Sequence, residues 1–550
     1  MNRGTRATIR TLAALGVVVI AAIGLWAQQD HLWLICLALC APLIGLALWR
    51  GDATGKSVFD RSAMRLAHIV LTLFMLLSLH LVHLQAVSAD YISGRTARTS
   101  LGTVRNPRVL EADLSARRGE IFSADGTKIV GRQVLPDGTV RRTYGDPNLT
   151  YLVGYNNPIR YGSSGLELAY NDALTGRTDN DSLRAAAGGV LHQPLQGSDL
   201  ILTAVGPVQA RAAAALGNRR GSVVVLDART GAVVAMVSAP YLDPAGLAPG
   251  QPEQSQAYWD QLRNDPASPF VFRPTQGLYS PGSTFKTITA AAAIDSGKAK
   301  ADTIYEDRGV IVIEGYRLIE RNIPANRSQQ QAFTLNEAYA YSLNVVFAQV
   351  AARTLGGPLL AEYARRFGFG EELPFDLFTN AAVLSNRPDF LQNGPAVAET
   401  GFGQGELLAS PLQMATVAAA IANDGKAMTP YLVAAVRRPD GTTAERHQPK
   451  VWRDAVRAET AVQMRAIMEN SVQTGYANGA AIPNVRVGGK TGTAENPGGN
   501  PHAWYIGYAT GKTTTYAIAV IVENGGDGST VAAPIAKQVL EATLAYDARR

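Results

Sequence analysis

Cysteine and histidine are scarce in this sequence, and their scarcity excludes several kinds of site. Only Cys36 and Cys40 occur in 550 residues, too few for a disulfide framework or a cysteine-ligated zinc site. The seven histidines are scattered, and no His-Glu-x-x-His pattern is present, so neither a zinc hydrolase nor a histidine-based triad is indicated. We therefore expect no metal site and no cofactor.

Charged residues are also few. They make up 17% of the chain, against roughly 25% in an average soluble domain, while 47% of the residues are hydrophobic. This composition excludes a disordered chain, and the length allows two or more domains with cores of their own. The net charge of +6 at pH 7 leaves nucleic acid or a membrane as candidate partners.

Three long runs near the N-terminus lack charged residues. They cover about residues 11–27, 31–49 and 66–87, and the third contains histidines but no Asp, Glu, Lys or Arg. Each run has close to the roughly 20 apolar residues that a helix needs to cross a bilayer. The first is not a cleavable signal, because the second follows almost at once without a small-residue cleavage site. Residues 1–87 are thus predicted to be a membrane module with three transmembrane helices.

The flanking charges predict how these helices are oriented. The bases of this region precede the first run or lie between the second and the third: Arg3, Arg6, Arg10, Arg50, Lys56, Arg61 and Arg65. The loop 28–30 between the first two runs has no base. By the positive-inside rule, the N-terminus is cytoplasmic and everything after the third helix lies outside the cell membrane.

The same charges account for most of the basic excess. Residues 1–87 hold seven bases and three acids, a net +4, which leaves only +2 for the 463 residues from 88 to 550. A nearly neutral extracytoplasmic part gives no support to nucleic-acid binding, so we expect no nucleic-acid partner.

The extracytoplasmic part changes character near residue 197. Residues 88–196 are rich in turn signals such as Asp125-Gly126 and predict a β-rich, irregular module. From 197 to 550, apolar strand-like segments near both ends enclose Ala-rich helical stretches, which predicts one α/β domain whose sheet is built from distant segments. The expected strands are 199–205, 503–508, 514–522 and the hairpin 221–239, and the expected helices include 208–216 and 534–546.

The first motif that carries chemistry is Ser-x-x-Lys within Tyr279–Lys286 (YSPGSTFK). Pro-Gly breaks the chain and the run from Ser283 onward is helix-forming, so Ser283 and Lys286 are expected on one face of a first helical turn. A serine hydroxyl needs a neighbouring base to become a nucleophile. A lysine amine can serve as that base when burial or a nearby cation lowers its pKa.

The second motif is Ser342-Leu343-Asn344, on or beside the predicted helical stretch 334–354. Ser342 could relay a proton between the lysine and a leaving group, and Asn344 could position a substrate amide. Each of these residues alone is more often a helix residue that bonds to backbone.

The third motif lies in Gly488–Glu495 (GGKTGTAE), just before a predicted strand, and is expected to form an edge strand facing the site. Lys490 can attract a substrate carboxylate and lower the pKa of Lys286 by like-charge repulsion. Thr491 and Thr493 supply hydroxyls, and glycines such as Gly492 let the backbone approach a ligand closely.

Taken together, these motifs resemble a known family. Ser-x-x-Lys, Ser-x-Asn and Lys-Thr-Gly, in that order, form the signature set of penicillin-binding proteins and serine β-lactamases. Here Ser283 precedes Ser342 by 59 residues, and Ser342 precedes Lys490 by 148, which leaves room for an all-helical subdomain before the final strands. The sequence most resembles a class B penicillin-binding protein, a monofunctional peptidoglycan D,D-transpeptidase.

The resemblance extends beyond the motifs over most of residues 105–550. The further segments that carry it are Arg118–Ile121, Gly162–Glu167, Gly221–Pro240, Phe402–Gly405, Ser410–Ala415 and Trp504–Gly507. Two departures stand out. Ser123–Gly126 replaces an Asp-Arg-Asn-Gly-like run, and three predicted spans replace the usual single anchor.

The resemblance implies a fold and a set of roles. The fold is an α/β transpeptidase domain (197–550) above a β-rich pedestal (88–196) and the membrane module. Ser283 is the implied acylated nucleophile and Lys286 its base, while Ser342 and Asn344 assist. Lys490, Thr491, Gly492 and Thr493 bind the donor stem peptide, and the backbone N–H groups of Ser283 and Thr493 form the oxyanion hole.

The implied activity is cross-linking of D-Ala-D-Ala stem peptides, inhibited covalently by β-lactams, in cell-wall synthesis that serves cell shape or cell division. A multi-span peptidoglycan polymerase is the implied membrane partner. The alternatives are a membrane-anchored β-lactam sensor and a β-lactamase-like acylating protein. A bifunctional class A enzyme is disfavoured, because the 109 residues from 88 to 196 are too few for a glycosyltransferase domain.

Overall fold

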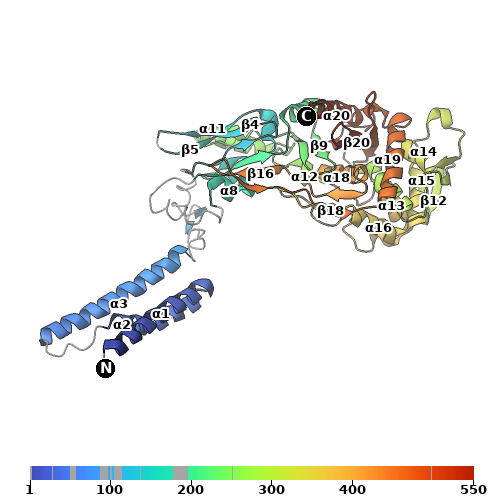
Figure 1. Cartoon of the computed structure of the whole chain (residues 1–550). Helices are drawn as coiled ribbons and strands as arrows, with labels where there is room; N and C mark the ends of the chain where they lie inside the picture. Colours follow the sequence, from blue (N-terminus) through green and yellow to red (C-terminus); the bar gives the residue numbers. More distant parts are fainter. Residues whose placement is uncertain are drawn as a thin grey trace. The chain divides into compact units, whose positions relative to one another are not determined.

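The structure is a computed structural model, shown in Figure 1. It describes residues 3–27, 29–49, 57–86, 97–99, 102–104, 114, 116–136, 138–177, 196–249, 252–496 and 498–549. Arg50 and Lys56, parts of the predicted pedestal and the end of the third predicted span lie outside the described residues. The chain divides into two compact units, Met1–Asp113 and Leu114–Arg550, and each is described by itself.

The first unit contains long apolar helices. Among the described residues, three helices are long and apolar enough to cross a membrane. They are α1 (Arg3–Ala27), α2 (Asp30–Leu48) and α3 (Val58–Ala86). The expected three apolar helices are therefore confirmed, although α3 begins eight residues before the predicted span because the polar segment from Val58 to Arg65 continues the same helix. A short hairpin, β1 (Ala97–Thr99) with β2 (Gly102–Val104), completes the unit.

The three helices contact one another through a few specific side chains. The Trp33 Nε1 of α2 donates to His80 Nδ1 of α3 at 3.1 Å, and its ring stacks on His83 with centroids 4.6 Å apart. Cys40 is buried against α1, where its Sγ lies 3.8 Å from the Val17 carbonyl oxygen. The histidines and Cys40 thus serve helix packing.

The second unit is built on a five-stranded antiparallel sheet with strand order β10-β9-β21-β20-β19. Its strands are β9 (Gly221–Asp227), β10 (Val233–Ala239), β19 (Val487–Ala494), β20 (His502–Thr510) and β21 (Thr515–Val522). The expected hairpin, the expected late strands and the placement of Lys-Thr-Gly on an edge strand are all confirmed.

Helices cover both faces of this sheet, because its strands are apolar on both sides. One core joins alternate strand residues such as Val223 and Ile518 to α10 (Gly206–Leu216) and α20 (Ala532–Asp547). The other joins the intervening residues such as Val224 and Ala519 to α18 (Pro411–Ala422) and its neighbours. In Figure 1, α20 and α18 lie on either side of β9 and β20.

The middle of the chain differs from the expected all-helical subdomain. Its helical elements are α12 (Arg273–Gln276), η3 (Gly282–Phe285), α13 (Lys286–Asp295), η4 (Ala325–Arg327), α14 (Leu335–Ala340), α15 (Asn344–Gln349), the π-helix η5 (Val350–Leu355), α16 (Gly357–Arg366), η6 (Phe390–Gln392), α17 (Gly394–Gly401), α19 (Ala458–Gln473) and η7 (Asn478–Ala480). Short strands interrupt them: β11 (Ile304–Glu306), β12 (Val310–Ile313), β13 (Tyr316–Ile319), β14 (Ala332–Thr334), β15 (Lys426–Met428), β16 (Val433–Arg437), β17 (Thr443–Arg446) and β18 (Val451–Asp454).

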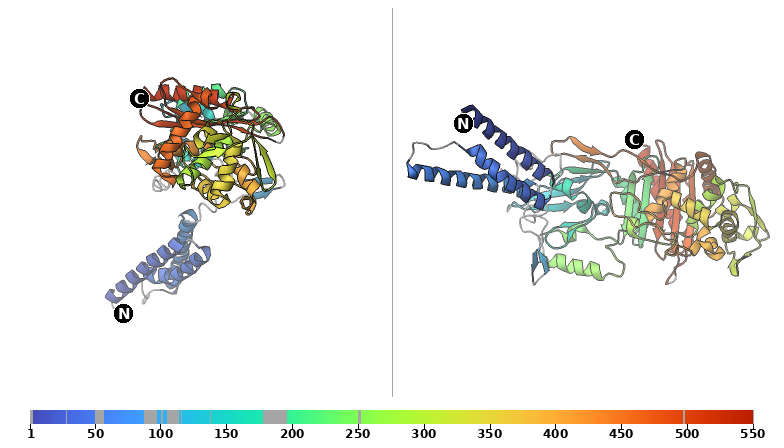
Figure 2. Two further views of the ribbon diagram at one scale, coloured as in Figure 1. Left: turned by 90° about the vertical axis from the view of Figure 1, so that its right-hand side faces the viewer. Right: turned by 90° about the horizontal axis from the view of Figure 1, so that it is seen from below.

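The all-helical expectation was therefore wrong, since strands of three to five residues give little periodic signal of their own. Figure 2 shows the yellow helical segments of this middle part at one end of the unit, opposite the N-terminal strands, whereas β16 and β17 join the sheet that holds those strands.

The N-terminal part of the second unit contributes to a six-stranded sheet of order β17-β16-β8-β3-β4-β5. The elements of this part of the chain are β3 (Ile121–Phe122), β4 (Lys128–Val134), β5 (Val140–Tyr144), α6 (Pro147–Thr150), β6 (Asn156–Asn157), β7 (Gly162–Ser163), α7 (Gly165–Ala169), α8 (Asn171–Thr175), β8 (Asp199–Leu202), η2 (Pro244–Leu247) and α11 (Pro252–Asn264). This sheet draws strands from both sides of the predicted boundary at 196/197, which stays a prediction.

Candidate active site

The first motif forms a tight turn that leads into a buried helix. Gly282, with φ +52°, opens the 3₁₀ turn η3, and α13 follows from Lys286. The Lys286 N–H donates to the Ser283 carbonyl oxygen, which closes the turn. Ser283 remains partly exposed, whereas Lys286 is fully buried. One turn therefore carries both a partly exposed serine and a buried lysine.

The Lys286 amine joins the first motif to the second. Its Nζ donates to the Ser342 carbonyl oxygen at 2.7 Å, to Ser342 Oγ at 3.2 Å and to Asn344 Oδ1 at 2.7 Å. The ammonium also lies 5.4 Å from the ring centroid of Phe347. Residues separated by 56 and 58 positions in sequence are thus brought into direct contact, as the motif order predicted.

The environment of Lys286 favours its neutral form. Burial lowers the pKa of Lys286 from 10.5 to about 7, although the charge of Glu320 acts to raise it. A base with a pKa near the working pH transfers protons efficiently. The amine is therefore suited to take a proton from an adjacent hydroxyl.

The second motif lies in the connection between α14 and α15. Ser342 has φ +58°, a left-handed conformation that costs energy for a residue with a Cβ and tends to occur at functional positions. Asn322 Nδ2 donates to the Ser342 carbonyl oxygen at 2.8 Å and helps to hold this conformation. Sequence reasoning placed Ser342 beside a helix but did not identify Asn322 or Glu320, because both precede the motif by about 20 residues with no pattern linking them to it.

The third motif lies on edge strand β19 and supplies a second buried amine. Lys490 Nζ donates to the Thr491 carbonyl oxygen at 2.9 Å and lies 5.7 Å from the ring centroid of Tyr339. Thr491 is buried, whereas Thr493 is exposed, so Thr493 has the hydroxyl more accessible to a ligand.

Burial and mutual repulsion both act on the two lysines. Burial lowers the pKa of Lys490 well below its usual value, and the charge of Lys286 lowers it further. Burial also lowers the pKa of Lys286. The predicted repulsion between the two amines is present, since the charge of Lys286 acts on Lys490.

Glycines let the turn that carries Ser283 pack against two other segments. A Cβ on Gly492 of β19 would lie 2.9 Å from Thr284 Cγ2 and 3.0 Å from the Pro281 carbonyl oxygen. A Cβ on Gly403 would lie only 1.7 Å from the Gly282 carbonyl oxygen. These contacts place β19 and the 402–405 segment directly against the turn that carries Ser283.

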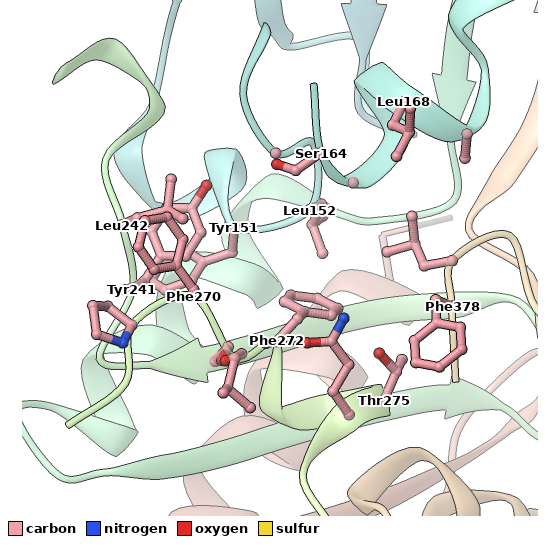
Figure 3. Close-up of a pocket in the computed structure, with 18 of the residues that line it drawn as sticks. Tyr151, Leu152, Ser164, Leu168, Tyr241, Leu242, Phe270, Phe272, Thr275 and Phe378 are labelled. Atoms are coloured by element: carbon pink, nitrogen blue, oxygen red, sulfur yellow. Dashed lines mark hydrogen bonds between the residues drawn. The ribbon is translucent and has the colours of Figure 1, made fainter. Parts of the chain in front are cut away.

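A separate cavity of about 310 Å³ lies away from the three motifs. In Figure 3, Leu152, Ser164 and Leu168 lie across the cavity from Thr275 and Phe378. Its lining is mainly apolar and includes none of the motif residues, so it has no part in the chemistry assembled around Lys286. Within the described ranges, no group of three or more His, Cys, Asp or Glu residues is placed to hold a metal ion.

Known proteins share this arrangement of sequence and fold. The profile of the penicillin binding protein transpeptidase domain matches residues 221–541. The Mycobacterium tuberculosis peptidoglycan D,D-transpeptidase PbpA is 32% identical over 502 residues, which cover 88% of this chain and 99% of that protein. The protein of the same name from Mycolicibacterium smegmatis is 33% identical over 501 residues, with the same two coverages.

Solved structures of related proteins have the same fold. The imipenem acyl-enzyme complex of penicillin-binding protein A from M. tuberculosis superposes with a TM-score of 0.73 at 32% identity, covering 78% of this chain and 99% of that one. The D,D-transpeptidase domain of a peptidoglycan glycosyltransferase from Eggerthella lenta gives a TM-score of 0.69 at 32% identity, covering 79% and 99%.

Proposed function

The chain belongs to the penicillin-binding protein transpeptidase family and is a peptidoglycan D,D-transpeptidase, and we propose that Ser283 is the nucleophile it uses to form the acyl-enzyme. The observation that carries this assignment is the contact of the Lys286 amine with both Ser342 and Asn344, because Lys286 closes the same turn that carries Ser283. The fold and family findings support the β-lactam-reactive penicillin-binding protein predicted from the motifs.

In the proposed first half-reaction, Ser283 Oγ attacks the carbonyl carbon of the penultimate D-Ala of a stem peptide. Its proton passes to neutral Lys286, and the new C–O bond gives a tetrahedral intermediate. The C–N bond to the terminal D-Ala then breaks. The leaving amine takes a proton through Lys286 and Ser342, which restores the neutral lysine.

In the second half-reaction, an amine on a neighbouring strand attacks the acyl-enzyme. It loses a proton to the same lysine–serine pair as the new C–N bond of the cross-link forms. The ester C–O bond to Ser283 then breaks, and the pair returns the proton to Ser283 Oγ, which regenerates the neutral lysine. A β-lactam follows only the first half, because its leaving nitrogen stays tethered to the acyl group. The imipenem and ceftriaxone acyl-enzyme complexes of the M. tuberculosis relative support this step.

The other motif residues are assigned supporting roles. Asn344 positions the substrate amide, and Lys490 with Thr491, Gly492 and Thr493 receives the donor peptide along β19. The backbone N–H groups of Ser283 and Thr493 act as the oxyanion hole. The contact of Gly282 with the end of β19, where a Cβ would lie 3.1 Å from the Thr493 carbonyl oxygen, supports pairing these two groups.

Time-resolved labelling with a fluorescent penicillin tests this function against its alternatives. We expect the full-length protein in detergent to form a stable adduct and the Ser283→Ala variant to form none. Rapid turnover of the label would instead favour a β-lactamase. Release of D-Ala and formation of cross-linked dimer from a synthetic stem peptide then separates a transpeptidase from a sensor, which acylates without either reaction.

The membrane module is assigned an anchoring and docking role. The basic flanks predict a cytoplasmic N-terminus and an extracytoplasmic catalytic part, and α1 to α3 offer more helix surface than one anchor needs. We propose that these helices, with the pedestal at 88–196, bind a multi-span peptidoglycan polymerase. Crosslinking in membranes through Cys36, which is only partly buried in α2, should capture such a partner, and the Cys36→Ser variant should not.

A further inference from the structure

A carboxylate that belongs to none of the three motifs holds the second motif in place. Glu320 directly follows β13, and its side chain accepts three backbone N–H bonds. Oε1 accepts from Arg321 and from Asn322, each at 2.9 Å. Oε2 accepts from Val345, the second residue of α15, at 2.8 Å. One carboxylate thus fastens the end of the β12–β13 hairpin to the helix that begins with Asn344.

The two segments tied together in this way carry the ligands of the Lys286 amine. Asn322 donates to the Ser342 carbonyl oxygen at 2.8 Å, and the same oxygen accepts from Lys286 Nζ at 2.7 Å. Asn344, one residue before Val345, accepts from that amine as well. Because Ser342 is held at φ +58°, its position depends on such external contacts.

Glu320 also sets the charge balance around the amine. Its charge opposes the effect of burial on Lys286 and raises the pKa of that lysine. Among the described residues, the charged or titratable groups that interact with Lys286 or Glu320 include Lys490 on β19, Asp307 after β11 and Tyr476 after α19, and Asp527 acts in turn on Lys490 and Tyr476.

Asp307 is a second carboxylate that interacts with Glu320. It is buried, and its Oδ2 has no donor among the described residues. Burial raises the pKa of Asp307 to about 6, with a further contribution from Glu320. Below that pH, protonated Asp307 can donate to Glu320, so the two carboxyl groups share one negative charge beside the lysine.

We propose that Glu320 is a positioning residue for acylation, which fixes Ser342 and Asn344 through its backbone bonds and holds a compensating negative charge beside the Lys286 amine. The proposal rests on the function proposed above and assigns the residue two separable effects. The bonds govern how fast Ser283 reacts once the lysine is neutral. The charge governs the pH at which the lysine becomes neutral.

Two substitutions separate these effects. Glu320→Gln removes the charge but keeps one acceptor oxygen, whereas Glu320→Asp keeps the charge but shortens the reach. Glu314→Gln is the matched control, because Glu314 lies in the same hairpin and also accepts a backbone N–H, from Gly394 at 2.9 Å, but does not act on Lys286. The measurement is the second-order rate constant for acylation by benzylpenicillin from pH 5.5 to 9, with full-length proteins of verified melting temperature.

The rate should rise as Lys286 loses its proton, with a midpoint near pH 7 in the wild type. In Glu320→Gln the midpoint should fall by about one pH unit, the size of shift that one nearby charge produces. The plateau rate should fall by roughly tenfold, the effect of about 1.4 kcal/mol. In Glu320→Asp the plateau should fall while the midpoint stays near the wild-type value, and Glu314→Gln should match the wild type in both.

An unchanged midpoint in Glu320→Gln, or equal midpoints in the Gln and Asp variants, would overturn the proposal even if the rates fall. Loss of folding in Glu320→Gln would leave Glu320→Asp as the deciding variant, where a shifted midpoint contradicts the assigned charge effect. Absence of acylation in the wild type is a different result, since it would refute the proposed function itself.

Discussion

At the scale of single residues, the proposed chemistry depends on keeping Lys286 neutral. Lys286 is enclosed by oxygen acceptors and the ring of Phe347, and burial brings its pKa to about 7. The sequence predicted the pair Ser283 and Lys286 correctly as neighbours on one turn. It could not predict that burial dominates, because the groups that contact the amine, on Ser342, Asn344 and Phe347, lie at least 56 positions away in the sequence.

Replacing Lys286 by arginine tests whether this residue is needed as a base or only as a positive charge. Lys286→Arg keeps a cation, but a guanidinium stays protonated at all working pH values and cannot act as a base. We expect the acylation rate constant to fall by about 10²–10⁴-fold, the contribution typical of a general base. Lys298→Arg, on an exposed lysine just beyond α13, is the control and should leave the rate unchanged. A Lys286→Arg variant that acylates within threefold of the wild type would contradict the assigned role.

At the scale of elements, the site depends on how closely two chain segments approach the turn that carries Ser283. Gly492 brings β19 against it, and Gly403 brings the segment after α17 against it. The sequence analysis predicted close approach to a ligand for the glycines of Lys-Thr-Gly and made no such prediction for Gly403. The structure shows that Gly403 approaches the Gly282 carbonyl group.

A pair of glycine substitutions tests this contact. Gly403→Ala and Gly370→Ala place an alanine at similar backbone angles, φ +90° and +91°, but only Gly403 would clash, since nothing lies within 4 Å of a Cβ on Gly370. Both should lose about 1–2 kcal/mol from backbone strain. Gly403→Ala should in addition lower the acylation rate at least tenfold by displacing the turn. Equal acylation rates in the two variants would show that this contact does not position Ser283.

A second element contact lies in the N-terminal part of the second unit. Glu167 of α7 is buried between Arg118 and Arg142, with N–O distances of 2.7 and 2.6 Å. Burial acts to raise the pKa of Glu167, but the two arginines outweigh it and the pKa is lowered. Arg118 and Glu167 belong to the segments Arg118–Ile121 and Gly162–Glu167, which carry the resemblance to a pedestal. Their ion pair joins these two segments in the folded protein.

Glu167→Gln should therefore destabilise the protein strongly, because it leaves two buried arginines without a countercharge. We expect a cost of about 3–5 kcal/mol, seen as a lower melting temperature, whereas Glu362→Gln, on a surface pair with Arg366, should change it little. Since the pKa of Glu167 is lowered, its contribution is present above the usual carboxyl pKa and is lost as the pH falls through the lowered value. The difference between wild type and Glu167→Gln should shrink accordingly at low pH, and a difference independent of pH would contradict the ion-pair account.

At the scale of the whole molecule, the sequence predicted the central sheet well and the surrounding pieces less well. Strands of eight or nine residues such as β20 and β21 carry a long apolar signal, so their existence and end positions were close to those observed. The four-residue β17 is exposed along its length, and β16 pairs with β8 some 230 positions earlier. Nothing local in the sequence identifies such pairings.

The prediction for the whole molecule concerns the orientation of the chain in the membrane. The seven bases of residues 1–87 place the 50–65 loop in the cytoplasm by the positive-inside rule. An alkaline phosphatase domain, active only outside the cytoplasm, should therefore be inactive when fused after residue 55 and active when fused after residue 550. The reverse pattern, or activity at both positions, would contradict the predicted topology.

The central claim is that Ser283 is the residue acylated in this D,D-transpeptidase, and peptide mapping by mass spectrometry tests it most directly. The full-length protein is incubated with benzylpenicillin, digested and searched for the covalent adduct. We predict one adduct, on the peptide that contains Ser283, and its loss in Ser283→Ala. An adduct on Ser342 or on any other residue, or no adduct in the wild type, would contradict the account.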